Sequence, residues 1–173
     1  MGMDIYGLEP LNEQGEYFRN NVWWWRILYT YCVDCYPECL GEEPERGHDN
    51  SGYIIDDENA TKLGLALLQD LKNGDVTKYK EGYYHYVSSL PREHCDICDG
   101  TGIRTDEIGV SNKMPEKELD SLTASFVNRT HGWCNGCNGI GTKSPFEANY
   151  RFEESNVEKF AKFCLASGGF KIL

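Results

Sequence analysis

The sequence lacks the features by which many proteins reach a membrane or a nucleic acid. No apolar run approaches the roughly 20 residues that a membrane-spanning helix needs. The 17 Lys and Arg face 28 Asp and Glu, so the formal net charge is −11. Clustered positive charge, which DNA, RNA and anionic lipids attract, is therefore missing. The sequence predicts no membrane segment and no direct nucleic-acid partner.

Export signals and the common catalytic motifs are absent as well. The N-terminal residues do not place a basic stretch before an apolar one, so we expect a cytoplasmic protein. There is no nucleophile elbow, no phosphate-binding glycine loop and no zinc-protease or zinc-deaminase motif. These absences favour a non-enzymatic protein. A pocket built from Tyr and Trp would leave no motif, so an enzyme or a small-molecule or nucleotide-binding protein remains an alternative.

The 173 residues suit one core with a small appended module. We expect a mainly helical α+β fold, in which residues 1–91 and 143–173 form a compact helical body. Residues 92–142 are expected to form an inserted zinc-bound module of β-hairpin type. The net charges are −9 for residues 1–91, −3 for 92–142 and +1 for 143–173. The acidic character therefore belongs mainly to the first part of the chain.

Helix signals are local and recur along the chain. Asn20 and Asn21 can cap a helix over 22–32, and Asp56 can open one that Gly74 ends. Residues 76–90 favour a further helix, with a strand as the alternative for 83–87. In the C-terminal part, Ser155 and Glu158 predict a capping box and 170–172 a terminal strand. Between the cysteine motifs, Pro115 is expected to start a helix with Leu119, Leu122 and Phe126 on one face.

Two copies of the motif C-x-x-C-x-G-x-G predict a metal site. The first runs from Cys95 to Gly102 and the second from Cys134 to Gly141. Two intervening residues let one tight turn direct both sulfurs at one ion, and the glycines let backbone N–H groups point at those sulfurs. We expect Cys95, Cys98, Cys134 and Cys137 to bind one structural Zn²⁺. Four cysteine ligands leave no open position for a substrate.

This doubled motif resembles the repeats of the DnaJ-type cysteine-rich zinc domain. That family usually carries four repeats and two zinc ions on a V-shaped β-hairpin structure, so two repeats imply one zinc site. The His-Pro-Asp tripeptide and the Gly/Phe-rich linker of the full co-chaperones are missing. The remaining sequence, including Trp23–Arg26 and Ser167–Phe170, is similar to small uncharacterised proteins of phages and bacteria. That likeness implies an accessory role in a host cytoplasm.

The other cysteines give a weaker signal. Cys32, Cys35 and Cys39 could belong to a second metal site, completed by His48 or Cys164. No glycine turn accompanies them, so we favour small buried thiols at a helix end. His94 and His131 lie near the metal motifs and are expected to pack around the four cysteines rather than to replace one.

Trp23, Trp24 and Trp25 are candidate contact residues for a partner. Successive helical residues turn by about 100°, so three neighbouring indoles cannot share one face. We expect most of them in the core and one near the surface, where tryptophan is typical of binding hot spots.

Together these features favour a zinc-stabilised protein-binding accessory factor whose partner is a host or client protein. Its narrower form is a phage-encoded inhibitor of a host or defence protein, in which acidic surface occupies a basic channel. A DnaJ-like zinc holdase chaperone is the second hypothesis.

Overall fold

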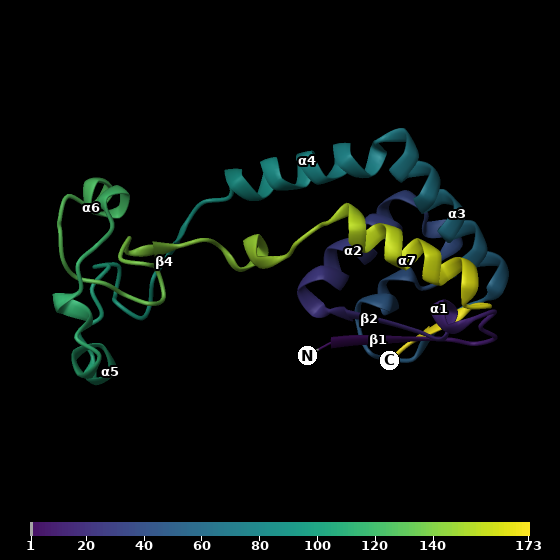
Figure 1. The fold of residues 1–173 in the computed structure, drawn as a ribbon, viewed down its shortest axis with the longest axis horizontal. Coiled ribbons are helices and arrows are strands. Elements are labelled where there is room, and N and C mark those ends of the chain that lie inside the picture. The colour runs from purple at the N-terminus through teal and green to yellow at the C-terminus, as the bar shows by residue number, and fades with distance from the viewer. Residues whose placement is uncertain (1) are drawn as a thin grey trace. The chain divides into compact units, whose positions relative to one another are not determined.

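The computed structural model describes residues 2–173 and divides the chain into two compact units (Figure 1). The helical unit comprises the residues up to Ser88 together with Asn149–Leu173, and the cysteine unit comprises Ser89–Ala148. Seven α-helices and short antiparallel strands confirm the mainly helical α+β class. Among the helices of residues 2–173, none has both the length and the hydrophobicity to span a bilayer.

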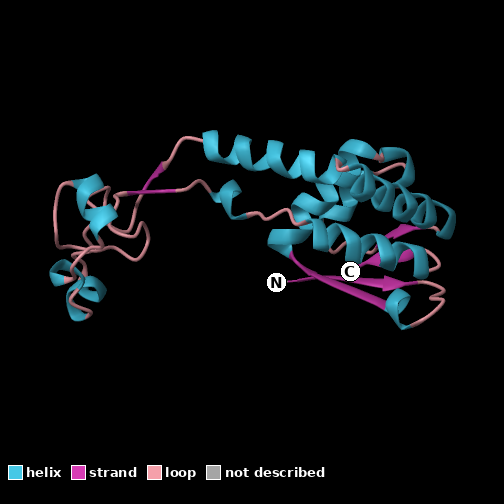
Figure 2. Cartoon of the chain, turned by 45° about the horizontal axis from the view of Figure 1, so that its top comes forward, coloured by secondary structure: helices cyan, strands magenta, loops and turns pink. Residues whose placement is uncertain are grey.

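A four-stranded antiparallel sheet forms one layer of the helical unit, in the order β2-β1-β6-β3. Its strands are β1 (Gly2–Gly7), β2 (Tyr17–Asn21), β3 (Tyr53–Ile55) and β6 (Phe170–Ile172). Alternate residues of each strand are buried, which is the period of a sheet covered on one side. Both ribbon views place helices over one face of this sheet (Figure 2).

The helices of this unit begin where the sequence supplies a cap. Asn21 accepts the Trp23 N–H at 2.7 Å, and Asp56 accepts the Asn59 N–H at 2.8 Å. The helices are α1 (Glu13–Glu16), α2 (Val22–Cys35), α3 (Asp57–Asn73), α4 (Asp75–Ser89) and α7 (Glu154–Ala166), with 3₁₀ turns at Pro37–Cys39 and Pro44–His48. A further 3₁₀ turn, Phe146–Asn149, spans the boundary where the chain returns from the cysteine unit. Residues 83–87 are therefore helical, within α4.

Aromatic side chains fill the space between the sheet and the helices. Trp25 is fully buried, stacks on Tyr29 at 5.0 Å between ring centroids, and meets the edge of Phe160 at 5.2 Å. Its indole nitrogen donates to the Gly47 carbonyl at 2.8 Å, so burial leaves no polar atom of this side chain unpaired. Phe160 also packs against Phe170 from the terminal strand. The core thus joins distant segments through aromatic contacts.

The cysteine unit contains little regular structure. Its strands β4 (Glu93–His94) and β5 (Thr142–Lys143) pair over two residues each, and its helices are α5 (Glu107–Ser111) and α6 (Ser121–Val127). A 3₁₀ turn covers Met114–Glu116. The β-structure expected for this region is therefore confined to the short β4–β5 pairing.

Two sequence predictions about helix starts are wrong. Pro115 lies in a 3₁₀ turn, and α6 begins only at Ser121, where Asp120 accepts two backbone N–H groups. Leu119 is consequently buried outside the helix. In α7 the helix begins at Glu154, so Ser155 lies inside its first turn and forms no cap.

Candidate metal centre

Four sulfur atoms from two distant turns meet in the cysteine unit. The Sγ atoms of Cys95, Cys98, Cys134 and Cys137 all lie within 4.8 Å of one another, and all four residues are buried. Each C-x-x-C segment folds into a tight turn in which the first carbonyl accepts two later N–H groups, for example those of Cys98 and Gly100. The spacing therefore brings each pair of thiols to one point, as the motif predicts.

The sulfur separations fit a tetrahedral metal. The Cys95 and Cys134 sulfurs are 3.9 Å apart, and the Cys98 and Cys137 sulfurs are 3.7 Å apart. A tetrahedron with Zn–S bonds of about 2.3 Å has edges of about 3.8 Å. A disulfide requires about 2.05 Å, so these pairs are not disulfides. The cluster can hold one tetrahedral divalent ion.

Backbone N–H groups point at the sulfurs in nearly the same way in both turns. Gly102 donates to Cys98 Sγ at 3.2 Å and Gly141 donates to Cys137 Sγ at 3.2 Å. Gly136 adds a bond of 3.4 Å to Cys134 Sγ. Such N–H groups stabilise negative charge on sulfur, which a thiolate ligand needs.

The last glycine of each motif also lets the two turns approach closely. A Cβ on Gly102 would clash with the Gly139 carbonyl, and a Cβ on Gly141 would clash with the Gly100 carbonyl. The contact is reciprocal, so each turn presses its final glycine against the other turn. Both glycines also have positive φ values, +75° and +92°. Sequence reasoning assigned them to the N–H geometry and missed this packing role.

Burial and hydrogen bonding act in opposite directions on these thiols. Burial raises the pKa values of Cys98, Cys134 and Cys137, and the N–H bonds of the glycines oppose that rise. Burial also raises the pKa of Cys95, but hydrogen bonds from its neighbours, Cys98 first, bring the pKa below its ordinary value. Four buried thiols therefore ionise together only when a cation compensates their charge.

Three basic side chains surround the cluster. Arg129 donates to the Gly139 carbonyl at 2.5 Å, and Arg104 donates to Asn135 at 2.9 Å, so each holds the second turn. Lys143 pairs with Asp96 of the first turn at 3.1 Å. Arg104 also pairs with Asp106 at 2.8 Å, so Arg104 and Lys143 each have a carboxylate partner, and of the three only Arg129 has no ion pair within residues 2–173. No sequence pattern marks these residues, because each acts through a fold contact.

The two histidines near the motifs are not part of the cluster. His94 Nε2 lies 3.0 Å from Asp99 Oδ1, and its ring packs over Gly100. His131 Nδ1 lies 3.0 Å from the Thr130 hydroxyl. His94 therefore lies beside the first turn, as expected, whereas the side-chain partner of His131 is its neighbour Thr130.

The remaining cysteines form no comparable group within residues 2–173. Cys32, Cys39 and Cys164 are buried in the helical unit, and Cys35 is exposed. Burial raises the pKa of Cys32 and Cys164, so both are neutral thiols at physiological pH. His48 lies apart from them, edge-on to the Tyr29 ring.

The three tryptophans occupy different environments. Trp25 is in the core, whereas Trp23 and Trp24 are half-buried at the start of α2. Trp23 lies 5.3 Å from the Tyr150 ring between centroids. Two indoles thus retain accessible surface.

Comparison with protein-family models, with curated proteins and with solved structures finds no match to this chain.

Proposed function

We propose that the cysteine unit is a structural zinc module and that the protein uses it to bind another protein. The observation that carries the first part is the set of sulfur separations, 3.7 and 3.9 Å, which fit a ZnS₄ tetrahedron. Zinc suits four thiolates better than the hard cations calcium and magnesium, which prefer oxygen. With four protein ligands the ion has no position for a substrate, which favours a structural role.

Burial within the unit supports a folding role for the metal. Among its described residues, the buried apolar side chains are the four cysteines, Leu119 and Pro145. So small an apolar core does not offset the conformational entropy of 60 ordered residues. The resemblance to the DnaJ-type repeats agrees with this reading, because in such modules the metal replaces a hydrophobic core.

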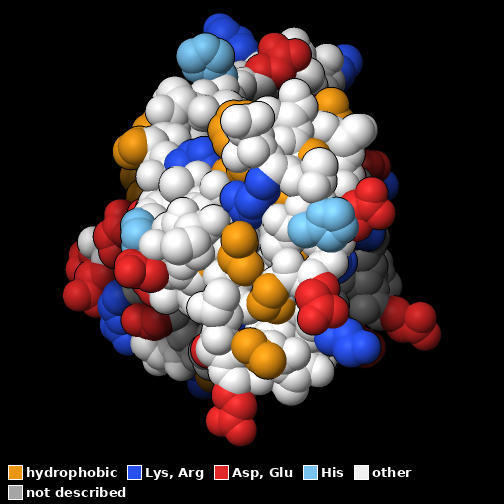
Figure 3. Space-filling model, turned by 90° about the vertical axis from the view of Figure 1, so that its left-hand side faces the viewer, with side chains coloured by type: hydrophobic (Ala, Val, Ile, Leu, Met, Phe, Trp, Pro, Cys, Tyr) orange, Lys and Arg blue, Asp and Glu red, His pale blue; other side chains and the backbone are white. Residues whose placement is uncertain are grey.

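Exposed apolar side chains support the protein-binding part. On α6, Leu122 is 83% exposed and Phe126 is 74% exposed, and a spacing of four residues puts them on one helix face. On α5, Ile108 and Val110 are also exposed. Figure 3 shows hydrophobic side chains between charged ones on one face of the molecule. Such surface is costly in water unless a partner covers it.

The partner that we propose is a protein with a complementary apolar patch. The helical unit adds acidic surface, since residues 1–91 carry a net charge of −9. Acidic surface speeds association with basic partners. An inhibitor that blocks a basic channel of a host or defence protein is the specific form of this proposal, and it places the protein in a host cytoplasm.

The test compares the proteins that the wild-type chain and two variants retain from host lysate. We expect one or a few proteins to be retained by the wild type and lost from a Leu122→Ser/Phe126→Ser variant. Leu65→Ser, which changes an exposed leucine of α3, is the matched control and should retain them. Metal analysis of all three proteins should give one zinc per chain. Equal retention by the double variant would contradict the proposed surface.

A holdase chaperone is the second candidate, because the same exposed face of α6 could hold unfolded chains. It predicts that the protein suppresses aggregation of a denatured client and that the double variant does not. Suppression without any stable complex with a native protein would favour the holdase. Unchanged aggregation kinetics would remove it.

A further inference from the structure

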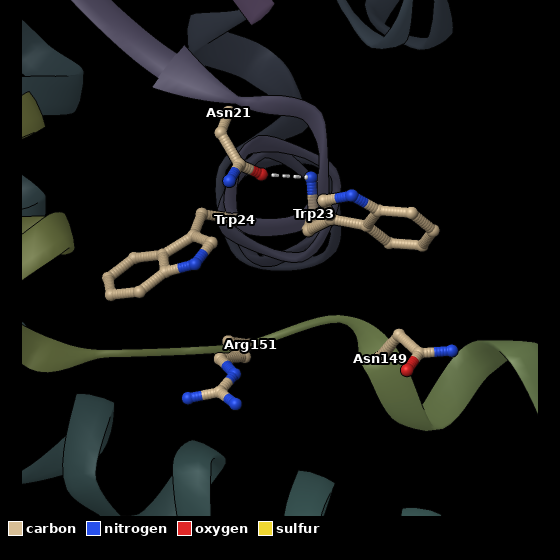
Figure 4. Close-up of a pocket in the computed structure, with 5 residues that line it drawn as sticks. All are labelled: Asn21, Trp23, Trp24, Asn149 and Arg151. Carbon is tan, nitrogen blue, oxygen red and sulfur yellow. Dashed lines mark hydrogen bonds between the residues drawn. The ribbon is translucent and has the colours of Figure 1, made fainter. Parts of the chain in front are cut away.

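The start of α2 contributes to two neighbouring hollows in the helical unit. The first hollow, of about 420 Å³, is lined by Asn21, Trp23, Trp24, Asn149 and Arg151. Figure 4 shows the two indoles on opposite sides of the first turn of α2, facing the segment that carries Asn149 and Arg151. Trp24 and Asn21 also line the second hollow, of about 340 Å³. The ring of Trp24 is thus accessible from both.

The second hollow contains a buried amide pair with open hydrogen-bonding capacity. Asn20 and Asn156 line it, and they are 6% and 8% exposed. The Asn20 amide nitrogen donates to the Asn156 amide oxygen at 3.0 Å. No other side-chain hydrogen bond of either amide occurs within residues 2–173, so the Asn20 oxygen and the Asn156 nitrogen remain unpartnered. Both atoms are reached by solvent in the hollow, so they are open to a polar ligand that enters it.

Basic side chains lie around the same indole. Arg151 lines the first hollow, and Arg19 and Lys159 line the second. Within residues 2–173, Arg151 and Lys159 have no ion pair, and Arg19 is 3.7 Å from Asp4. The neighbouring acids of α7 are engaged elsewhere: Glu154 with Lys80 and Glu158 with Lys162. This surface is basic on a chain whose net charge is −11.

We propose that these two hollows bind a free nucleotide, with its base against Trp24. The indole supplies a flat stacking surface, the amide pair supplies a donor and an acceptor for the base edge, and the basic groups hold the phosphate. Each of the three parts of a nucleotide therefore meets a matching group. This site lies in the helical unit and goes beyond the proposed protein-binding role of the cysteine unit.

The charge distribution favours a free nucleotide over a nucleic-acid strand. A strand would extend past the three basic groups, and its affinity depends on the number of phosphates that Lys and Arg neutralise. Beyond this patch, residues 1–91 are strongly acidic. A single nucleotide needs only the local charge, and hollows of this size fit small ligands.

The probes are AMP, GMP, CMP, UMP, ribose 5-phosphate and a single-stranded hexanucleotide. Calorimetry on the zinc-loaded full chain measures binding, and quenching of tryptophan fluorescence reports stacking. We expect at least one mononucleotide to bind and to quench. Ribose 5-phosphate, which lacks a base, is expected to bind at least tenfold more weakly.

Two variants locate the site. Trp24→Leu removes the stacking surface and should weaken nucleotide binding about tenfold or more. Lys159→Ala should weaken it several-fold and make the affinity less dependent on salt. Lys162→Ala removes the same charge from the same helix, outside the hollows, and should bind as the wild type does. Circular dichroism and melting temperature confirm that each variant is folded.

Mononucleotide binding that Trp24→Leu and Lys159→Ala weaken and Lys162→Ala leaves unchanged supports the proposal. Three results overturn it: no mononucleotide binds at millimolar concentration, the hexanucleotide alone binds, or ribose 5-phosphate binds as tightly as the nucleotides. Should Trp24→Leu fail to fold, Lys159→Ala and the base-free probe still decide the question.

Discussion

The helical unit and the cysteine unit hold their chains together by different means. The core of the helical unit contains 24 buried residues, many of them aromatic. The buried cluster of the cysteine unit consists of four cysteines. Hydrophobic burial grows with the number of apolar side chains removed from water, so the first unit can fold through its own core. We propose that the second unit depends on a metal ion held by its four sulfurs.

Removing the metal should give the largest difference in stability between the two units. Chelation, or the substitution Cys134→Ser, is expected to unfold residues 89–148 and to leave the helical unit folded. Structural zinc contributes on the order of 10 kcal/mol to small domains, more than one buried Leu119 can replace. Hydrogen exchange followed by mass spectrometry should show lost protection in the cysteine unit and retained protection in α3 and α7.

The control for this experiment is another cysteine. Cys35 is exposed and lies outside the cluster, so Cys35→Ser should change neither metal content nor protection. Full protection of residues 89–148 in metal-free protein would show that the unit has another source of stability, and the contrast between the units would fail.

The opposite perturbation removes part of the aromatic core. Phe160 is fully buried and packs against Trp25, Phe163 and Phe170. Phe160→Ala should destabilise the helical unit by about 3–5 kcal/mol. Denaturant unfolding measures this loss, while the zinc content should stay at one ion per chain. Leu65→Ala, at an exposed leucine of α3 in the same unit, is the control and should change the stability little. Loss of zinc in Phe160→Ala would mean that the two units fold as one.

Local signals in the sequence predicted the longer helices of the helical unit, but of its four strands the sequence analysis expected only the terminal one, β6. Asn21 and Asp56 cap helices within a few residues of themselves, so a single segment contains the information. The cysteine quartet was predictable for a related reason. Each turn directs its own two sulfurs, and only the meeting of the two turns depends on the fold.

The errors and omissions involve residues whose role depends on distant parts of the chain. Pro115 suits a first helical turn but starts only a 3₁₀ turn, because Glu118 bridges to His131 just beyond it, and α6 starts later. The Asn20–Asn156 pair joins positions 136 residues apart. No sequence periodicity connects positions so far apart. No motif marks Arg129 or Arg151 either. Tertiary contacts of this kind become visible only in the folded chain.

Glycine substitutions test the packing of each unit at the scale of one methyl group. Gly141→Ala should destabilise the cysteine unit by about 2 kcal/mol or more, because the Cβ would clash with the Gly100 carbonyl at a positive φ. Gly82→Ala in α4 has the opposite expectation. A Cβ there meets nothing within 4 Å, and alanine favours a helix by about 1 kcal/mol. Chelator competition measures the first effect, and thermal unfolding of the helical unit measures the second.

Wild-type metal affinity in Gly141→Ala would show that the two turns are not pressed together as tightly as their contact indicates. A lower melting temperature in Gly82→Ala would mean that this position serves the fold in a way that its open surroundings do not explain.

Lowering the pH should change the stability of the helical unit very little and that of the cysteine unit more. Lys162 donates to Glu158 and lowers the pKa of that carboxyl. A lowered folded-state pKa contributes stability above the usual value of about 4.3, and this contribution is lost as the pH falls through the folded-state pKa. The pair is exposed, so its effect on the melting temperature should be near the limit of detection.

If thiolates bind a metal, acid also removes their stabilisation, but the loss begins at a higher pH because the thiol pKa in the unfolded chain is higher. Their pKa in the unfolded chain is about 8.5, so the metal's contribution is complete above that value and falls as protons compete for the sulfurs. Between pH 6 and 4, roughly, the cysteine unit should lose zinc while the Glu158–Lys162 pair stays ionised. Carboxyl chemical shifts followed by NMR would report the pKa of Glu158, which should rise towards its usual value in Lys162→Ala. Zinc release measured in the same titration should be unchanged by that substitution, because the pair belongs to the unit that does not need the metal.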